Sequence, residues 1–272
     1  MDIMLQEQNI QDIKQPILAL IVPVYYEQDN IIKLLDDIQE KIKIPIKLYI
    51  IYDTEIDPTV EVVKKIKDQY PFPVDLVLNR IGPGALNAIK TGLHIFKEDA
   101  CVIIMADSSD DLNTINGMYG LFCQGFHIVC ASRYMRNGRQ IGGNYLKKVL
   151  SKIAGKSLYY ITKLPTHDVT NSFKLYSKEA ISQINIKSSG GFEIGMEIVV
   201  KSFLKGLAIA EVPTIWHDRY VGNSKFKLFK WLPHYLKWYL LILLKNPFIN
   251  HKKIKYNKIR KKWTIISKWN RS

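Results

Sequence analysis

The residues best suited to chemistry are three carboxylates that follow an apolar run. Asp107, Asp110 and Asp111 lie in the segment MADSSDD, at the end of the run Cys101–Ala106. Carboxylates packed this closely repel each other unless a cation or solvent relieves them. Oxygen ligands of this kind suit Mg²⁺ or Mn²⁺, and such an ion commonly bridges to substrate phosphates. The segment therefore predicts a divalent-metal site, although an acidic turn that caps a helix beginning near Asn113 explains the same residues.

Two further segments offer groups that bind phosphate. The loop Asn79–Asn87 (NRIGPGALN) opens into a helical pattern, and backbone N–H groups at such an entrance can receive phosphate oxygens. Further along, Arg133 and Arg139 supply guanidinium groups, and Lys147 and Lys148 add charge that could neutralise a phosphate. Both signals have a plainer interpretation, because many loops contain two glycines and a basic cluster can be a solvated face.

A polar stretch between apolar runs, Thr166–Phe173, is the next candidate region. A loop of this composition inside a folded body is more often a site than a linker. Asp168 could act as a general base or position one, whereas His167 fits a structural histidine better. Glu193 and Glu197 lie four residues apart on a predicted helix, so both can face one cleft. Either glutamate could instead pair with a lysine.

The elements that position these residues alternate between short β-branched runs and helical patterns. This alternation is typical of a parallel sheet flanked by helices. In such a sheet, ligands bind beyond the carboxyl ends of the strands, where Pro23–Glu27, Asp53 and Asp107 are expected. The strands are predicted over Ile17–Val24, Lys47–Tyr52, Val74–Leu78, Cys101–Ala106 and His127–Ala131, and the helices over Asp29–Lys41, Val60–Tyr70, Gly84–Phe96, about 142–161 and Gly191–Phe203.

The positive charge of the chain is concentrated at its C-terminal end. Of 39 Lys/Arg and 25 Asp/Glu, 15 basic and no acidic residues lie from Arg219 to Ser272. The first 218 residues therefore hold 24 basic and 25 acidic side chains, a nearly neutral body. All five tryptophans also lie at position 216 or later, and a basic, Trp-rich tail suits anionic lipid headgroups. A nucleic-acid-binding protein would carry its charge on the body, so we expect no nucleic-acid partner.

The segment Phe226–Leu244 predicts a helix that lies in a membrane surface. Lys227, Lys230, His234 and Lys237 form one polar stripe, and the remaining face holds Phe, Leu, Trp and Tyr. The longest uncharged run there has 7 residues, far short of the roughly 20 that span a bilayer. Alternatively, the apolar face packs on the body or on a second subunit.

Composition and the N-terminal residues bear on the compartment. The chain has 47% hydrophobic residues and so can bury a substantial core. Its three cysteines form no CxxC pair, which suits a reducing compartment, and the first residues contain acids and no signal-like apolar stretch. We therefore expect a protein at the cytoplasmic face of a membrane, attached peripherally and without a transmembrane segment.

Taken together and in order, these segments resemble family 2 glycosyltransferases, particularly the polyprenyl-phosphate sugar synthases of the dolichol-phosphate mannose synthase type. The resemblance runs from about residue 17 to residue 238 and implies a GT-A fold. The residues that it assigns to the nucleotide-sugar donor are Pro23, Tyr25 and Glu27 of the PVYYE segment, Asp53 for the nucleobase, Gly84 and Asn87 of the helix entrance, and Asp107 for the metal and diphosphate. The other matching segments are Ser132–Tyr134 (SRY), Asp168–Phe173 (DVTNSF), Glu193–Glu197 and Asp218–Lys225 (DRYVGNSK).

Two departures from the family pattern concern the donor site. Met105 stands where the first aspartate of the D-x-D motif is expected, so metal binding must rest on Asp107 with Ser109 or Asp110. Tyr52 likewise replaces the first of two aspartates in the nucleobase segment, which leaves Asp53. The resemblance therefore defines the fold, but it does not define which nucleobase is bound or how tightly the metal is held.

The resemblance also points to a lipid phosphate as acceptor. A hydroxyl acceptor needs a base to take its proton, whereas a phosphate is already anionic and needs cations to hold it. By resemblance, Arg133, Lys147, Ser151 and Arg219 hold that phosphate. We therefore predict an inverting transfer of mannose or another hexose from a GDP- or UDP-sugar to a polyprenyl phosphate.

Two other functions remain open from the sequence. A transferase of the same fold could act on a glycan hydroxyl, with Asp168 or Asp110 as base, or the protein could bind nucleotide sugars without catalysis. The predicted layout is an N-terminal extension (1–16), a GT-A domain (17–224), an amphipathic membrane-surface helix (225–246) and a basic tail (247–272).

Overall fold

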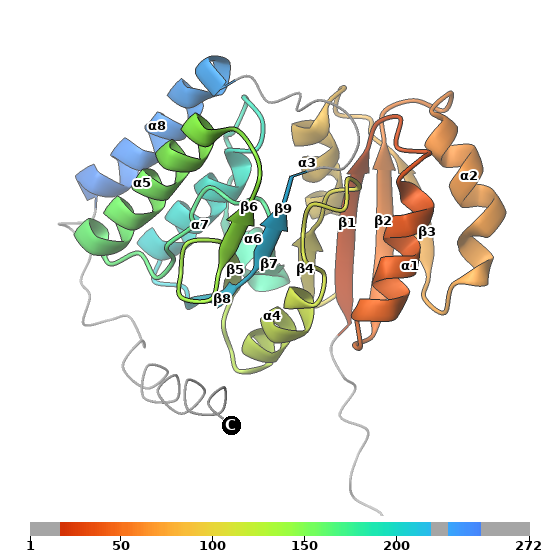
Figure 1. Ribbon diagram of the computed structural model, residues 1–272, viewed down its shortest axis with the longest axis horizontal. Helices are drawn as coiled ribbons and strands as arrows, with labels where there is room; N and C mark the ends of the chain where they lie inside the picture. The colour runs from red at the N-terminus through yellow and green to blue at the C-terminus, as the bar shows by residue number, and fades with distance from the viewer. Residues whose placement is uncertain (1–16, 219–227, 246–272) are drawn as a thin grey trace, which may run out of the picture.

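A seven-stranded sheet forms the centre of the protein, a computed structural model that describes residues 17–218 and 228–245 (Figure 1). Its strand order is β3-β2-β1-β4-β7-β5-β8. β7 runs antiparallel to both of its neighbours, β4 and β5, and the other pairs are parallel. The bounds are β1 Leu18–Val24, β2 Ile46–Tyr52, β3 Val74–Leu78, β4 Ala100–Ile103, β5 Ile128–Ser132, β7 Lys174–Ser177 and β8 Ile209–Pro213.

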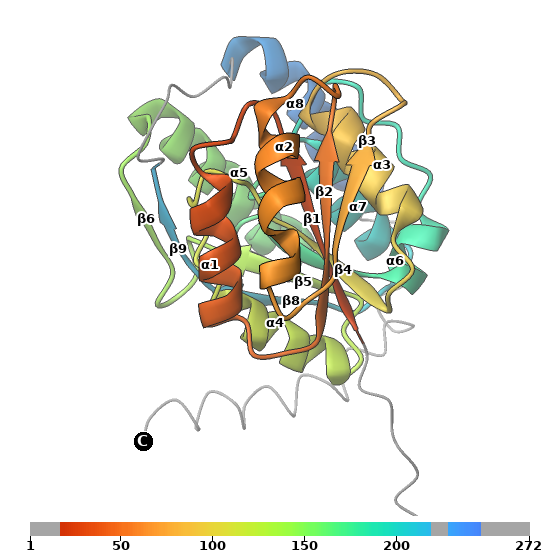
Figure 2. The ribbon, with the colours of Figure 1, turned by 90° about the vertical axis from the view of Figure 1, so that its right-hand side faces the viewer.

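Helices cover both faces of this sheet. Because successive side chains of a strand point to opposite faces, β1 sends Leu18, Leu20 and Val22 into one core and Ala19 and Ile21 into the other. The first core is closed by α1 (Ile31–Lys41), α2 (Pro58–Ile66) and α4 (Thr114–Cys123), and the second by α3 (Ala85–Ile95), α5 (Tyr145–Thr162), α6 (Lys178–Gln183), α7 (Ile194–Leu204) and α8 (Leu228–Lys245). Figure 2 shows α1 and α2 on one side of the sheet and α3 on the other.

The expected α/β fold class is confirmed, with differences at particular elements. The strand predicted over Cys101–Ala106 ends at Ile103, where the chain turns toward the acidic segment. The helix predicted over Val60–Tyr70 begins at Pro58, because Asp57 caps it, and gives way to a short 3₁₀ helix, η1 (Lys67–Gln69). A two-stranded ribbon of β6 (Arg139–Ile141) and β9 (Ile215–His217), absent from the prediction, lies beside the main sheet.

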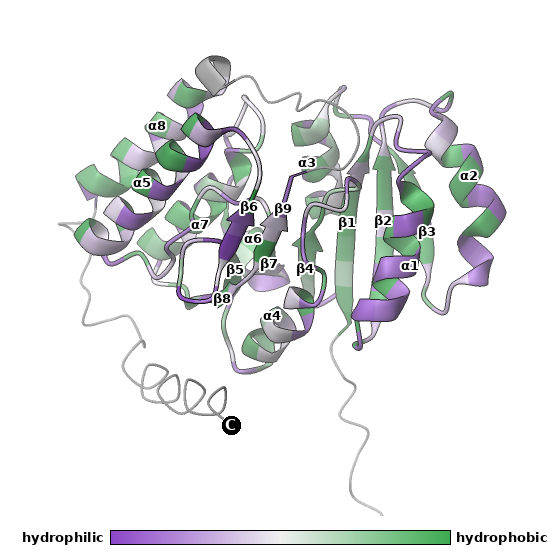
Figure 3. Cartoon of the chain, in the orientation of Figure 1, coloured by the Kyte–Doolittle hydropathy of each residue, from purple (hydrophilic) through white to green (hydrophobic). Residues whose placement is uncertain are grey.

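Helix α8 packs against α5 and α7 through one face. Trp238 and Ile242 are 3% and 0% exposed, and the ammonium of Lys201 lies 4.9 Å from the centre of the Trp238 ring. For the face that carries Trp238 and Ile242, the alternative prediction is therefore confirmed: this face packs on the body of the protein. The other face exposes four leucines, and Figure 3 shows the apolar colouring along α8 and the adjacent α5. Within the described residues, no helix combines the length and the apolar character that crossing a bilayer needs.

Candidate functional site at the carboxyl edge of the sheet

The topology brings the predicted site segments to one edge of the sheet. The segments after β1, β2, β3 and β4 begin at the carboxyl ends of mutually parallel strands. Arg133 follows β5 directly. Because β7 is antiparallel to β5, the segment Thr166–Phe173 enters the sheet from this same edge. The segments that the sequence predicts beyond the carboxyl ends of the strands therefore lie along one edge of the sheet.

On the donor side, Asp53 fixes the glycine-containing loop. Its Oδ1 accepts a hydrogen bond from Asn79 Nδ2 at 2.8 Å, and its Oδ2 accepts one from the Gly84 amide at 2.7 Å. Gly84 has a φ of 103°, and a Cβ built there would have nothing within 4 Å. The entrance of α3 is thus open at Gly84, where the positive φ favours glycine, and the Gly84 amide itself is taken by Asp53.

Asn87 and the Tyr25–Glu27 turn lie on this donor side as well. Asn87 donates from Nδ2 to the Pro83 carbonyl at 3.3 Å within the entrance of α3. The rings of Tyr25 and Tyr26 are about half exposed and pack edge to face with centroids 4.8 Å apart. Half-exposed aromatic rings after β1 offer faces on which a nucleobase could stack.

The acidic segment after β4 folds into a tight turn. Asp107 Oδ1 accepts from the Ser109 amide at 3.2 Å, and Ser109 is buried. Burial and then the charge of Asp107 raise the pKa of Asp110 to about 7. Asp110 Oδ2 is buried without a hydrogen-bond partner among the described residues. Asp111 Oδ1 accepts from the Asn113 amide just before α4, but α4 itself has no side-chain cap.

These acids fit a divalent ion that is shared with a substrate. A buried carboxylate oxygen without a partner, beside a second carboxylate, is a place where a cation relieves repulsion. Among the described residues, no group of three His, Cys, Asp or Glu could enclose a metal alone. Mg²⁺ is commonly held by one or two carboxylates plus substrate phosphates, so Asp107 with Ser109 or Asp110 would be the protein's share of such a site.

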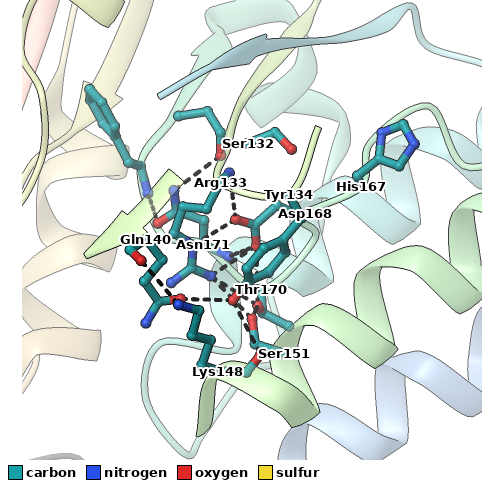
Figure 4. Close-up of polar contacts among 12 residues, drawn as sticks. Ser132, Arg133, Tyr134, Gln140, Lys148, Ser151, His167, Asp168, Thr170 and Asn171 are labelled. Carbon is teal, nitrogen blue, oxygen red and sulfur yellow. Dashed lines mark hydrogen bonds and ion pairs between the residues drawn. The ribbon is translucent and has the colours of Figure 1, made fainter. Parts of the chain in front are cut away.

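Arg133 and Asp168 form the electrostatic centre of the site (Figure 4). Arg133 Nε lies 2.6 Å from Asp168 Oδ2, Arg133 Nη2 lies 2.9 Å from Asp168 Oδ1, and the Arg133 amide donates to the same carboxylate. Burial opposes ionisation of Asp168, but the charge and hydrogen bonds of Arg133 outweigh it and lower the pKa of Asp168 from its ordinary value. A carboxylate held in this way orients the guanidinium and is a poor proton acceptor.

Polar side chains from α5 and the Thr166–Phe173 segment surround the guanidinium. Arg133 Nη2 donates to Ser151 Oγ at 3.1 Å, and Ser151 and Thr170 share a short hydrogen bond. Lys148 Nζ donates to the Gln140 carbonyl at 3.1 Å, which ties α5 to β6. Figure 4 shows these groups converging from three segments that are distant in the sequence.

A cavity of about 670 Å³ opens from this cluster and runs between α5 and α8. Polar residues line its inner end and apolar residues line its outer walls, so these two parts suit different parts of one ligand. The polar end contains Asp107, Arg133, Lys147, Lys148, Ser151 and Thr170, and the walls include Leu150, Ile153 and Ala154 of α5 and Leu232, Leu236 and Tyr239 of α8. We call this feature the α5–α8 groove.

The structure thus separates the predicted residues into groups. Asp107, Arg133, Lys147 and Ser151 line the α5–α8 groove, whereas the donor residues lie along the neighbouring strand ends. Arg219 lies outside the described residues. Thr170, Trp216 and the apolar walls of the groove were missed, although Thr170 belongs to the polar stretch that the sequence singled out.

Three other predicted residues have structural roles. Glu197 pairs with Lys201 and accepts from the amides of Lys187 and Ser188 at 2.6 and 2.7 Å, which confirms the lysine alternative for this glutamate. Glu193 accepts from the Gly190 amide at 2.7 Å. His167 pairs with Glu211 at 2.6 Å and lies apart from the Arg133 cluster, in line with a structural histidine.

Fold and site together describe an α/β protein with acidic and basic side chains gathered at the carboxyl edge of its sheet. The chain belongs to glycosyl transferase family 2, whose model matches residues 19–184. It is 25% identical over 232 residues to a dolichol-phosphate mannosyltransferase of Pyrococcus furiosus, covering 81% of this chain and 64% of that protein. It is 21% identical over 217 residues to a polyprenol monophosphomannose synthase of Mycolicibacterium smegmatis, covering 76% and 79%.

Solved structures resemble the fold as well. Glucosyl-3-phosphoglycerate synthase of Mycobacterium tuberculosis, solved with Mn²⁺, UDP and glucosyl-3-phosphoglycerate, aligns with a TM-score of 0.59 at 16% identity. The alignment covers 86% of this chain and 81% of that one. A likeness at this identity shows the fold, and the predicted GT-A arrangement is confirmed.

The chain spans less than two thirds of the Pyrococcus relative, at 64% of its length.

Proposed function

We propose that the protein is an inverting glycosyltransferase that moves a hexose from a GDP- or UDP-sugar to a polyprenyl phosphate at a membrane surface. The observation that carries this proposal is the α5–α8 groove, which has cations at one end and apolar walls at the other. A lipid phosphate has the same two-part character. The two curated relatives are named for a dolichol phosphate and a polyprenol acceptor, which supports the same class.

In the proposed reaction, an acceptor phosphate oxygen forms a bond to the anomeric carbon as the bond to the nucleoside diphosphate breaks. Arg133 and Lys147 hold the acceptor phosphate, and Ser151 and Asp168 orient the Arg133 guanidinium. Asp107, with Ser109 or Asp110, would hold Mg²⁺ or Mn²⁺, whose charge stabilises the leaving diphosphate. No proton has to be removed from an ionised phosphate, so the lowered pKa of Asp168 is no obstacle.

A hydroxyl acceptor is the second candidate, and one observation favours it. The pKa of Asp110, raised to about 7 by burial and by Asp107, is closer to that of a general base at neutral pH than the lowered pKa of Asp168. Such an acceptor would not need the apolar walls of the groove. The two candidates therefore predict different effects of changing a wall residue.

Ile153→Glu tests the acceptor class. Ile153 is 59% exposed and lines the groove, and a charge there should oppose a lipid chain but leave a soluble hydroxyl acceptor unaffected. Losing an apolar contact worth about 1.5 kcal/mol corresponds to roughly tenfold weaker use of detergent-dispersed polyprenyl phosphate. Ile161→Glu is the matched control, because Ile161 is 60% exposed on the same helix and does not line the groove. Equal transfer by both variants and the wild type would contradict a lipid acceptor in the groove.

Peripheral attachment to an anionic membrane is also part of this proposal. The side of α8 turned away from α7 exposes Leu232, Leu236, Leu240 and Leu244, four residues apart and between 42% and 71% exposed, and the first two of them also line the α5–α8 groove. A leucine stripe at this spacing lies on one side of a helix and suits the headgroup–acyl boundary. The basic residues predicted to add charge beyond α8 lie outside the described residues.

A double variant, Leu240→Gln with Leu244→Gln, separates attachment from catalysis. Neither residue lines the groove, so transfer to detergent-dispersed acceptor should remain near the wild-type rate. Binding to vesicles that contain anionic lipid should fall by roughly tenfold, because two partly inserted leucines are lost. Unchanged vesicle binding would exclude this face of α8 as the membrane contact.

A further inference from the structure

The turn that follows β1 has a backbone conformation that its own residues do not favour. Tyr26 has a φ of 57°, in the left-handed region, although it is not glycine. Side chains other than Gly, Asn or Asp seldom occupy this region, and they keep it where surrounding contacts hold them. Tyr26 lies between Tyr25 and Glu27, the two residues of this turn that the family resemblance assigns to the nucleotide-sugar donor.

The contacts that hold this turn come from the start of α2, about thirty residues later in the chain. The Tyr26 amide donates to Asp57 Oδ2 at 2.9 Å, and the Glu27 amide donates to Thr59 Oγ1 at 2.8 Å. Asp57 and Thr59 are both 0% exposed. Two consecutive backbone N–H groups of the turn are therefore bonded by two buried side chains of one neighbouring segment.

Capping of α2 accounts for only part of this arrangement. Asp57 Oδ1 accepts from the Thr59 amide at 2.9 Å, which is the ordinary cap of a helix N-terminus. The second carboxylate oxygen of Asp57 and the hydroxyl of Thr59 are not needed for that cap, yet both accept from the turn. The two segments meet because they follow the paired ends of β1 and β2, where Val24 lies opposite Tyr52.

We propose that Asp57 and Thr59 are positioning residues that hold the Tyr25–Glu27 turn in the form that binds a nucleoside diphosphate. This inference rests on the proposed nucleotide-sugar function. Without these acceptors, two amide donors lose their buried partners and Tyr26 is free to leave the left-handed region. The Tyr25 ring and the Glu27 backbone then lose their fixed places after β1, and the nucleotide must order the turn when it binds.

Thr59→Val is the informative variant, because valine keeps the shape and the backbone amide that Asp57 caps but removes the hydroxyl acceptor. We expect roughly tenfold weaker binding of UDP or GDP in the presence of Mg²⁺, the effect of leaving one buried donor unpaired. KM for the donor sugar should rise by a similar factor, while KM for the acceptor stays unchanged. Thr59→Ser keeps the hydroxyl and should restore nucleotide binding.

Two further variants keep the test decisive. Ser177→Ala removes the side-chain cap of α6, where Ser177 Oγ accepts from the Ala180 amide at 3.0 Å, and should lower stability without changing nucleotide affinity. Asp57→Asn should weaken nucleotide binding in the same way as Thr59→Val. It provides the test if the Thr59→Val protein does not fold. Wild-type affinity in both Thr59→Val and Asp57→Asn, or equal losses in Thr59→Val and Thr59→Ser, would overturn the positioning role. A wild-type protein that binds neither UDP nor GDP would overturn the proposed function itself.

Discussion

Gly155 on α5 provides a sharp test of how the acceptor end of the site is built. A Cβ placed at Gly155 would lie 2.0 Å from the carbonyl oxygen of His167 and 2.8 Å from its carbonyl carbon. Both atoms belong to the backbone of the segment that carries Asp168. No side-chain rotation relieves such a clash, so α5 and this segment must move apart by more than an ångström in Gly155→Ala.

The expected losses of stability and of acceptor use in Gly155→Ala follow from the contacts that this movement breaks. Overpacking of a close interface costs about 1–3 kcal/mol. Ser151, one turn before Gly155, bonds Arg133 at 3.1 Å, and a displacement of α5 lengthens that contact beyond hydrogen-bonding range. We therefore expect Gly155→Ala to lower the free energy of unfolding by about 2 kcal/mol and to lower acceptor use by at least tenfold.

Gly120→Ala is the matched control, since Gly120 also lies inside a helix, α4, and a Cβ there would meet nothing within 4 Å. This change should raise the free energy of unfolding by about 0.5–1 kcal/mol, because alanine loses less backbone entropy on folding. Urea unfolding measures both values, and UDP or GDP binding shows whether the donor side is intact. A Gly155→Ala protein as stable and as active as Gly120→Ala would refute the close approach of α5 to the Asp168 segment.

Two other predictions concern charged groups of the site. Asp107→Asn should abolish the Mn²⁺-dependent rise in melting temperature that UDP or GDP produces in the wild type, and a retained rise would remove Asp107 from the metal site. Asp168→Asn should lower the free energy of unfolding at pH 7 by about 3–5 kcal/mol, because it leaves Arg133 as a buried charge without its counter-ion. The pKa of Asp168 in the folded protein is lowered from its ordinary value by Arg133, so its stabilising contribution is present above the ordinary pKa and is lost as the pH falls through the folded pKa. The difference between wild type and Asp168→Asn in acid titrations of stability should therefore shrink below about pH 4, and a constant difference would contradict the pairing.

The residues at the carboxyl edge could be predicted from the sequence because parallel strands place all such ends together. Asp53 and Asp107 each follow a buried apolar run, and that pattern alone locates them. Arg133 was predicted as a phosphate ligand from its basic neighbourhood, and it does line the groove. Asp168 was predicted as a site residue that acts as a general base or positions one, but its bidentate contact with Arg133 could not be predicted, because sequence does not show which carboxylate faces which guanidinium.

Other features depend on tertiary packing that has no local signal. The α5–α8 groove is formed by two helices about eighty residues apart, and an apolar helix face by itself does not identify its partner. The contacts of Asp57 and Thr59 with the turn after β1 depend on two features that the sequence does not show. These are the register of β1 against β2 and the left-handed backbone conformation of Tyr26. From the sequence, Asp57 could be recognised only as the start of a helix.

The most direct test of the central claim compares two acceptors that differ only in the phosphate. The protein is incubated with Mg²⁺, GDP- or UDP-hexose and either polyprenyl phosphate or the corresponding polyprenol, both dispersed in detergent. Our account predicts hexose on the phosphate, with inverted anomeric configuration, and no product from the alcohol, because Arg133 and Lys147 hold an anion at the inner end of the groove. Transfer to the alcohol or to a sugar hydroxyl, with none to the phosphate, would contradict it.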